Sequence, residues 1–245
     1  MTKERAKPTR VKATRIPKIE MPHENGMRYM KELKPVTIQQ NHYYQLIKEK
    51  KLIIVISKAG CGKTCLASRY AVQELIKKNY DKIIITRPNI GAEINELGHL
   101  PGSVVEKMGM FIRPVLDELI HYGLTNQEII QKIDDNIIEI IPFFYMQGRS
   151  FINSIIIAEE VQNCTYDQIL LLLTRFSRRS KLILTADVTQ SYLPKNQRVD
   201  LDSLGEFLSN RIPDVGYIHM DDTNIVREVL VQDVLGCIDE WKDKN

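Results

Sequence analysis

Six short apolar runs, separated by stretches with helical periodicity, restrict the fold of this chain more than any other feature of its sequence. Each run is four or five residues long and mostly aliphatic, which is typical of strands buried on both faces of a sheet. The runs lie at residues 52–56, 83–86, 137–141, 155–158, 182–185 and 216–219. The helical stretches lie at residues 37–49, 64–78, 104–122, 126–133, 166–175, 201–210 and 225–241. Such alternation implies right-handed strand–helix–strand crossovers, so we predict an α/β fold with a three-layer parallel sheet.

The first 34 residues differ from the rest of the chain. They contain three prolines, scattered charges and no sustained apolar period, so we predict a basic, flexible arm over residues 1–34 and a single domain over residues 35–245. Residues 1–20 hold seven basic and two acidic side chains, whereas the whole chain has a net charge of only +3. Such an arm can add sequence-independent affinity for nucleic acid, because each phosphate contact releases counterions. A disordered, solubilising tail is the alternative.

Cysteine usage and hydropathy indicate the compartment. The four cysteines form no Cys-x-x-Cys pair and no metal-ligand spacing, which fits a reducing environment. The N-terminus is too polar for a signal peptide, and no apolar run approaches the length that crosses a membrane. We therefore expect a cytoplasmic protein with no membrane partner.

A glycine-containing loop follows the first apolar run and precedes a helical stretch. Residues 57–64 read Ser-Lys-Ala-Gly-Cys-Gly-Lys-Thr. Gly62, Lys63 and Thr64 match the end of the phosphate-loop pattern Gly-x-x-x-x-Gly-Lys-Ser/Thr, whereas Ser57 replaces its first glycine. Glycines let successive N–H groups point at an anion, and the helix directs its positive end there. We predict that Lys63 contacts the β- and γ-phosphates of a nucleoside triphosphate and that Thr64 binds Mg²⁺. The residues predicted to bind the nucleotide are Ser57, Lys58, Ala59, Gly60, Cys61, Gly62, Lys63, Thr64 and Cys65.

Two carboxylates, Glu159 and Glu160, follow the run at residues 155–158. At this place in a phosphate-loop protein the first carboxylate holds the Mg²⁺ shell and the second polarises the attacking water. We predict Glu159 as a metal ligand, directly or through water, and Glu160 as the general base. Aspartate is usual at the first position, so the glutamate leaves the rate of hydrolysis open. Two solvated glutamates at a strand end are the alternative.

Two further strand ends carry polar residues. Asp187 and Gln190 follow the run at residues 182–185, at the edge where open α/β sheets bind ligands, and could sense the γ-phosphate through water. Arg87 follows the run at residues 83–86 and precedes Pro88, which stops a helix from forming there. Its guanidinium suits a phosphate or a nucleic-acid backbone. A buried ion pair with a neighbouring helix is the alternative for Arg87.

Taken together, the motifs resemble the PhoH family of P-loop ATPases, whose domain is similar to the first RecA-like domain of superfamily 1 helicases. The resemblance covers about residues 35–238 and is closest to compact, bacteriophage-type members. It departs from the family pattern at Ser57, Glu159 and Ala186. The matching pieces are the Gly-Lys-Thr loop, Thr-Arg-Pro at 86–88, Leu-Pro-Gly at 100–102 with Glu106 and Lys107, Tyr-Met-Gln-Gly-Arg at 145–149, Glu-Glu-Val-Gln-Asn at 159–163, Leu-Thr-Arg at 173–175, Thr-Ala-Asp-Val-Thr-Gln at 185–190 and Ile-Val-Arg-Glu-Val-Leu-Val-Gln at 225–232.

The resemblance implies binding and hydrolysis of ATP with Mg²⁺, and a link to RNA or single-stranded nucleic acid. It also implies that Gln40 pairs its amide with adenine. One RecA-like domain accounts for the residues after the arm, so a catalytic arginine from a neighbouring subunit would complete the site. We therefore expect a homo-oligomer, in its simplest form a hexameric ring, with Arg227 or Arg87 presented to the next subunit. An ordinary surface arginine is the alternative for Arg227.

Two other functions compete with an ATPase coupled to nucleic acid. A nucleotide-dependent assembly or switch module with little hydrolysis is favoured by Glu159 in place of aspartate. A small-molecule kinase fits less well, because no lid with clustered arginines is evident and Gln190 suits a helicase-type sensor.

Overall fold

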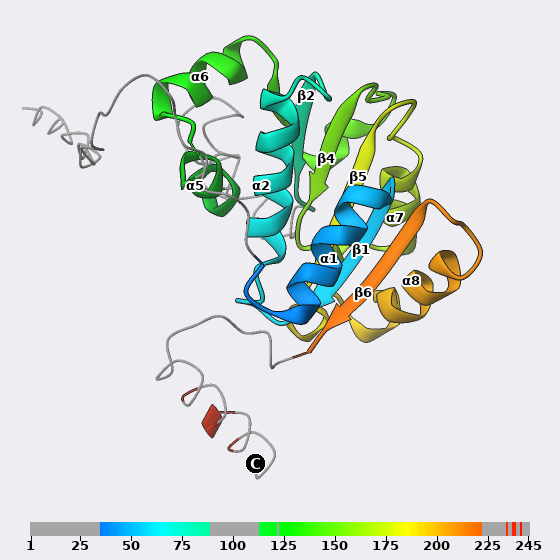
Figure 1. Cartoon of the computed structure of the whole chain (residues 1–245). Coiled ribbons are helices and arrows are strands. Elements are labelled where there is room, and N and C mark those ends of the chain that lie inside the picture. Colours follow the sequence, from blue (N-terminus) through cyan, green and yellow to red (C-terminus); the bar gives the residue numbers. More distant parts are fainter. Residues whose placement is uncertain are drawn as a thin grey trace, which may run out of the picture.

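The computed structural model describes residues 35–88, 113–121, 123–221 and the separate positions 234, 237, 238 and 241. The centre of this described part is a six-stranded parallel sheet with the order β3-β2-β4-β5-β1-β6 (Figure 1). The strands are β1 Leu52–Ser57, β2 Lys82–Thr86, β3 Ile138–Ile140, β4 Ser154–Ala158, β5 Lys181–Ala186 and β6 Val215–Met220. The sheet and its flanking helices confirm the predicted three-layer α/β fold.

Within the same residues, six α-helices cover the two faces of the sheet (Figure 1). They are α1 Ile38–Glu49, α2 Lys63–Ile76, α5 Arg113–His121, α6 Asn126–Asp134, α7 Tyr166–Leu173 and α8 Leu201–Ser209. Short 3₁₀ turns are η1 Phe143–Met146, η2 Val161–Asn163, η3 Val188–Gln190 and η4 Lys195–Gln197. Among the described residues, no helix combines the length and the apolar character needed to cross a membrane.

The strands are apolar throughout because both faces of the sheet are covered. Ile53 and Val55 of β1 join one buried cluster with residues of α1, α2, α5 and α6. Leu52, Ile54 and Ile56 join a second cluster with residues of α7 and α8. Alternate residues of a strand point to opposite faces, so a strand between two helical layers needs a continuous apolar run.

The helix boundaries follow local hydrogen bonding. The Thr37 side chain accepts from the Gln40 N–H at 3.1 Å and begins α1. The helix predicted at residues 166–175 ends earlier, at Leu173. The helix ends there because the chain pairs with another segment. The Arg175 carbonyl accepts from the Phe151 N–H at 3.0 Å.

Several predictions concern residues outside the described ranges. The arm at residues 1–34, Arg227 and most of the predicted helix at residues 225–241 lie there. The helix predicted at residues 104–122 is described only over α5.

Candidate nucleotide-binding site

The phosphate loop connects the end of β1, at Ser57, to the start of α2, at Lys63. Gly60 and Gly62 have φ angles of 95° and 84°, a region in which side chains are strained. A Cβ at Gly62 would also lie 3.2 Å from the Gln40 amide nitrogen. Ser57 is not among the residues with positive φ, so serine occupies the first position of the pattern without backbone strain. The loop therefore turns at its glycines and leads directly into the positive end of a helix.

Lys63 lies inside this turn. Its ammonium donates to the Ser57 carbonyl at 2.6 Å, to the Lys58 carbonyl at 3.1 Å and to the Ser57 hydroxyl at 3.1 Å. Burial lowers the pKa of Lys63, while the charges of Asp187, Glu160 and Glu159 act in the opposite direction. The loop thus holds a cation among three carboxylates at the carboxyl edge of the sheet, where ligands of such sheets bind.

Glu159 follows β4 and contacts the first turn of α2. The Thr64 hydroxyl donates to the Glu159 carboxylate, and the Glu159 N–H donates to the Thr86 carbonyl at 2.9 Å. The Glu159 side chain is buried. Burial raises its pKa and Glu160 adds to this effect, whereas the Thr64 hydrogen bond, Arg87 and Lys63 lower it. This hydrogen bond places Thr64 and Glu159 side by side, and their role as a metal-binding pair stays a prediction.

The donor set of this pair fits Mg²⁺. A hydroxyl and a carboxylate are hard oxygen ligands, and Mg²⁺ is usually held by one or two protein groups together with substrate phosphates. No cluster of three or more His, Cys, Asp or Glu that could hold a metal is found within the described residues. A cation held by this pair would share its coordination with the phosphates of the nucleotide, as is usual for Mg²⁺.

A second network connects Glu160 with the end of β5. Gln162 donates to the Glu160 carboxylate at 2.7 Å, and its amide oxygen accepts from the Asp187 N–H at 2.9 Å. Gln190 and Thr189 both donate to the Asp187 carboxylate, at 3.0 Å and 2.5 Å. Glu160 itself has a φ of 56°, a conformation that non-glycine residues rarely adopt and that clusters at functional sites. The predicted base and the predicted sensor are thus parts of one hydrogen-bonded unit.

Gln40 lies on the buried face of α1 with Tyr43. Its amide donates to the Cys61 carbonyl at 3.1 Å and accepts from the Val36 N–H at 2.8 Å. The Tyr43 hydroxyl donates to the Lys63 carbonyl at 3.3 Å. Gln40 therefore holds the phosphate loop against α1. The pairing of its amide with adenine stays a prediction.

The remaining predicted residues are placed as follows. Arg87, after β2, lies near enough to Glu159 for its charge to lower the pKa of that carboxyl group. Cys65 is hydrogen-bonded to Glu118 of α5, and burial raises the pKa of its thiol to about 11. A contact from Cys65 to phosphate would therefore use its backbone N–H. Arg227 lies outside the described residues.

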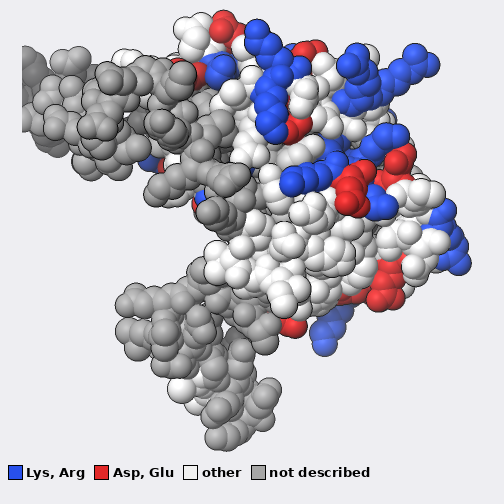
Figure 2. Space-filling view, in the orientation of Figure 1, with Lys and Arg blue, Asp and Glu red and all other residues white. Residues whose placement is uncertain are grey.

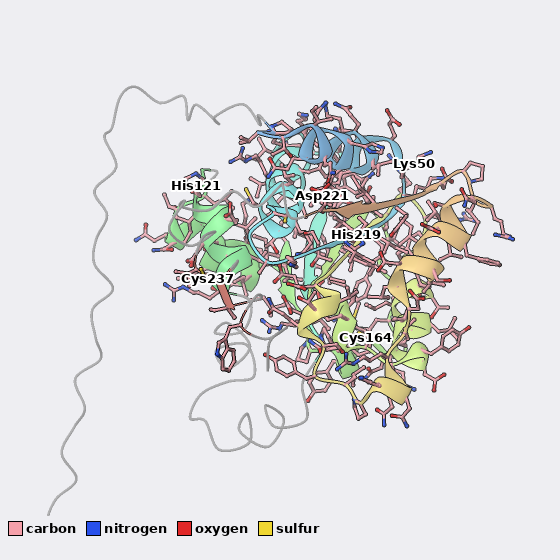
Figure 3. The ribbon with its side chains drawn as sticks, turned by 90° about the horizontal axis from the view of Figure 1, so that it is seen from below. Lys50, His121, Cys164, His219, Asp221 and Cys237 are labelled. Carbon is pink, nitrogen blue, oxygen red and sulfur yellow. The ribbon has the colours of Figure 1, made fainter. Side chains whose placement is uncertain are left out.

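Two residues of the site, Gln162 and Tyr43, were missing from the predicted set. Tyr43 shares the buried face of α1 with Gln40 at a spacing of three residues, a helical period that the sequence does contain. Gln162 carries no such signal, because its partners lie on another strand end. Figure 3 views the molecule from below, toward the ends of the strands, with His219 and Asp221 marking the end of β6.

The fold and the site together define the class of protein. A parallel sheet with a glycine loop after β1, carboxylates after β4 and a polar group after β5 is a RecA-like P-loop NTPase domain. A family model described as "PhoH-like protein" matches residues 32–239, and the chain belongs to this family. This confirms the family that the motifs predicted.

Individual relatives agree with this assignment. The chain is 37% identical over 198 residues to "Protein PhoH" of Escherichia coli (strain K12), covering 80% of this chain and 55% of that protein. It is 37% identical over 210 residues to a "PhoH-like protein" of Bacillus subtilis (strain 168), covering 86% and 65%. The chain thus spans somewhat more than half the length of these relatives.

A solved structure shares the fold. The large terminase from a thermophilic bacteriophage superposes with a TM-score of 0.52 at 12% sequence identity, over 82% of this chain and 50% of that one. At this identity the likeness concerns the fold alone.

Proposed function

We propose that this chain is an ATPase that hydrolyses Mg·ATP, with turnover coupled to RNA or another single-stranded nucleic acid. The observation that carries the ATPase part is the contact between Thr64 and Glu159, beside Lys63 and Glu160. It brings together the proposed metal ligands, the lysine proposed to contact the phosphates and a second carboxylate at one edge of the sheet. Membership of the PhoH-like family supports the same activity.

The proposed chemistry is an in-line attack of water on the γ-phosphorus. Glu160 accepts the proton of the attacking water, and the bond to the β–γ bridging oxygen breaks, so that ADP and inorganic phosphate leave. Lys63 exchanges the Ser57 and Lys58 carbonyls for phosphate oxygens. Gln162 positions Glu160, while Asp187 with Gln190 responds to the γ-phosphate. Mg²⁺ held by Thr64 and Glu159 would neutralise charge on the phosphates.

Phosphate release by the wild-type chain and by Glu160→Gln tests this activity. The glutamine keeps the size of the side chain but cannot accept the proton, so the variant should bind Mg·ATP and lose turnover by about 10²–10⁴-fold. Equal turnover by the two proteins would remove Glu160 from the mechanism. A matched variant, Glu139→Gln, alters a carboxylate that Lys82 and Arg149 bind away from the loop, and should keep full turnover.

The basic arm is proposed to bind the nucleic acid backbone. Deleting residues 1–20 removes seven cationic side chains, so affinity should fall and its dependence on salt should become flatter. Affinity of the truncated chain equal to that of the full chain, at low and at physiological salt, would leave the arm as a solubilising tail.

We further propose that residues 35–245 act as one domain in a cytoplasmic homo-oligomer, a head-to-tail ring of six subunits in its simplest form. Arg227 or Arg87 is the residue presented to a neighbouring site. Such an arginine is worth roughly 10³–10⁵-fold in rate. Mixing Arg227→Ala with Lys63→Ala subunits should restore part of the activity, whereas a monomer under solution mass measurement with Mg·ATP would rule out the ring.

Glu159, at a position where aspartate is usual, favours a second candidate, a switch that binds ATP with little hydrolysis. The extra methylene of glutamate changes the reach of its carboxylate to the metal. Glu159→Asp shortens this side chain. A large rise in turnover in the variant, from an undetectable wild-type rate with normal ATP affinity, would establish the switch.

A further inference from the structure

The polar atoms of Gln40 are turned toward the protein backbone, although the residue lies beside the phosphate loop. Gln40 is only 5% exposed. Its amide oxygen accepts from the Val36 N–H at 2.8 Å, and its amide nitrogen donates to the Cys61 carbonyl at 3.1 Å. An amide that reads adenine donates to N7 and accepts from the N6 amino group, so both of its polar atoms must face the base. A base would have to displace both backbone bonds to be read by Gln40.

The Cys61 carbonyl is the group of the loop that Gln40 fixes. The Cys61–Gly62 peptide is trans, so its carbonyl and its N–H point in opposite directions, and the Gly62 N–H points away from Gln40. Within the described part of the chain, this N–H has no hydrogen-bond partner. Free N–H groups in a glycine loop before a helix are the groups that bind phosphate. The bond from Gln40 therefore fixes the direction of one such donor.

The helix that carries Gln40 is held firmly behind the loop. The Gln40 N–H donates to the Thr37 side chain, which begins α1. Tyr43 and Ile47, on the buried face of the same helix, are fully buried. Gly62 permits the close approach, because a Cβ there would lie 3.2 Å from the Gln40 amide nitrogen. A fixed helix lets this one hydrogen bond hold the loop peptide in a single orientation before a ligand binds.

Basic side chains far from the loop contribute little to phosphate binding there. On the face shown in Figure 2, Lys and Arg gather toward the end of the molecule where the strands begin. The strands β1 and β6 have six residues each, so the two ends of the sheet lie about 20 Å apart, roughly twice the screening length in physiological salt. Binding of a triphosphate at the end of β1 therefore depends on local groups, which are Lys63 and the N–H groups of the loop.

We propose that Gln40 positions the Gly62 N–H for the phosphates and does not read the base. This inference rests on the proposed function and names the part of the substrate that the residue serves, which is the triphosphate group whatever base it carries. Without the bond to the Cys61 carbonyl the loop peptide is free to turn, so a ligand must order it on binding. A single hydrogen bond of this kind changes affinity by roughly 2- to 10-fold.

The test measures equilibrium binding of three ligands by the full chain: Mg·ATP, Mg·GTP and Mg·tripolyphosphate, the last of which has no base. Gln40→Met keeps the length of the side chain and removes both polar atoms of the amide. The variant should bind all three ligands more weakly, by a common factor of roughly 2- to 10-fold. Tripolyphosphate decides the question, because a residue that reads only adenine cannot affect its binding.

Gln39→Met is the matched control. Gln39 is the neighbouring glutamine of α1, and its amide bonds with the Asp221 carboxylate and N–H, directly after β6, at 2.8 Å and 3.0 Å. This variant should bind the three ligands as the wild type does, and thermal unfolding shows that each variant is folded. If Gln39→Met weakened tripolyphosphate binding as much as Gln40→Met does, the effect would belong to α1 as a whole and the proposal would be wrong.

The outcomes separate this proposal from the proposed function. Unchanged binding of tripolyphosphate by Gln40→Met, with or without a loss for ATP, would overturn the proposal and leave ATP hydrolysis standing. A common loss for the three ligands, in a chain whose wild type releases no phosphate from ATP, would support the proposal and remove the ATPase activity.

A measurement on the wild type alone covers the case in which Gln40→Met does not fold. The analogue 7-deaza-ATP lacks the N7 acceptor to which an adenine-reading amide donates. The proposal predicts equal affinity of the wild type for ATP and 7-deaza-ATP, and weaker binding of the analogue would overturn it.

Discussion

Lys63 and Lys181 both point into the protein, at opposite ends of the same sheet. Lys63 begins α2 at the edge where the strands end, and its ammonium donates to two carbonyls of the phosphate loop. Lys181 begins β5 at the other edge, and its ammonium donates to the carbonyls of Ile47 and Lys50 at the end of α1. Burial lowers the pKa of each, that of Lys181 to about 8.

The partners of the two lysines differ, and the difference indicates a binding role for Lys63 and a structural role for Lys181. Three carboxylates act on Lys63, from the ends of two strands, and its loop carbonyls are groups that phosphate oxygens can replace. Lys181 has one carboxylate, Glu74, acting on it and lies 5.3 Å from the centre of the Tyr70 ring. Its carbonyl partners are the unsatisfied end of a helix, which a cation stabilises. We therefore expect Lys63, whose partners can be exchanged for phosphate oxygens, to act in binding and Lys181 to act in stability.

The largest predicted difference between the two lysines is in turnover. Lys63→Ala should lower ATP turnover by at least about 10²-fold, because it removes the cation that stabilises the transferring phosphate. Phosphate release and ATP titration measure the effect, and thermal unfolding should show a folded variant. Lys181→Met serves as the control and should keep turnover. If Lys63→Ala hydrolysed ATP at the wild-type rate, the assignment of the loop would be wrong.

The second prediction concerns the free energy of unfolding, for which Lys181 is the residue expected to matter. Lys181→Met keeps the apolar stem but leaves the Ile47 and Lys50 carbonyls without their donor, so the free energy of unfolding should fall by about 1–3 kcal/mol. Lys51→Met, at the same end of the sheet, removes an exposed pair with Asp214 and should cost less than about 1 kcal/mol. Denaturant titration of the three proteins decides it, and equal losses in both variants would deny Lys181 its role as a helix cap.

Lys63 could be singled out from the sequence, whereas Lys181 could not. Lys63 lies in a motif whose strand, loop and helix are adjacent in the chain, and Glu159 and Glu160 follow a strand in the same way. The partners of Lys181 precede it by 131 and 134 residues, so no local pattern marks it. The same holds for Gln162, whose amide oxygen accepts from the N–H of Asp187, 25 residues later. Strand positions were predictable from apolar runs, whereas the contacts between strand ends required the sheet order.

The third prediction is the pH dependence of stability. The pKa of Lys181 is about 8 in the folded chain and 10.5 in the unfolded chain, so the unfolded state binds more protons between these values. Stability from this group therefore rises with pH in that window, by about 1 kcal/mol between pH 8 and pH 9. Unfolding of the wild type and of Lys181→Met at both pH values isolates the effect. A gap between the two proteins that narrows as the pH rises would contradict the sign.

The smallest predicted effect is that of Ser57→Gly, which restores the residue expected at the first position of the loop pattern. Ser57 is buried, its φ is not positive, and its hydroxyl accepts from Lys63 at 3.1 Å and donates to the Lys58 carbonyl at 3.2 Å. Glycine removes this hydroxyl but keeps the two carbonyls that also bind the ammonium. ATP affinity should therefore change by less than about tenfold. Glycine also adds backbone freedom at the end of β1, so stability should fall by about 0.5–1 kcal/mol. Nucleotide titration and denaturant unfolding of the variant measure the two effects. A loss of turnover above about 10²-fold, the size expected for a direct transition-state donor, would show that the serine hydroxyl acts on the phosphates themselves.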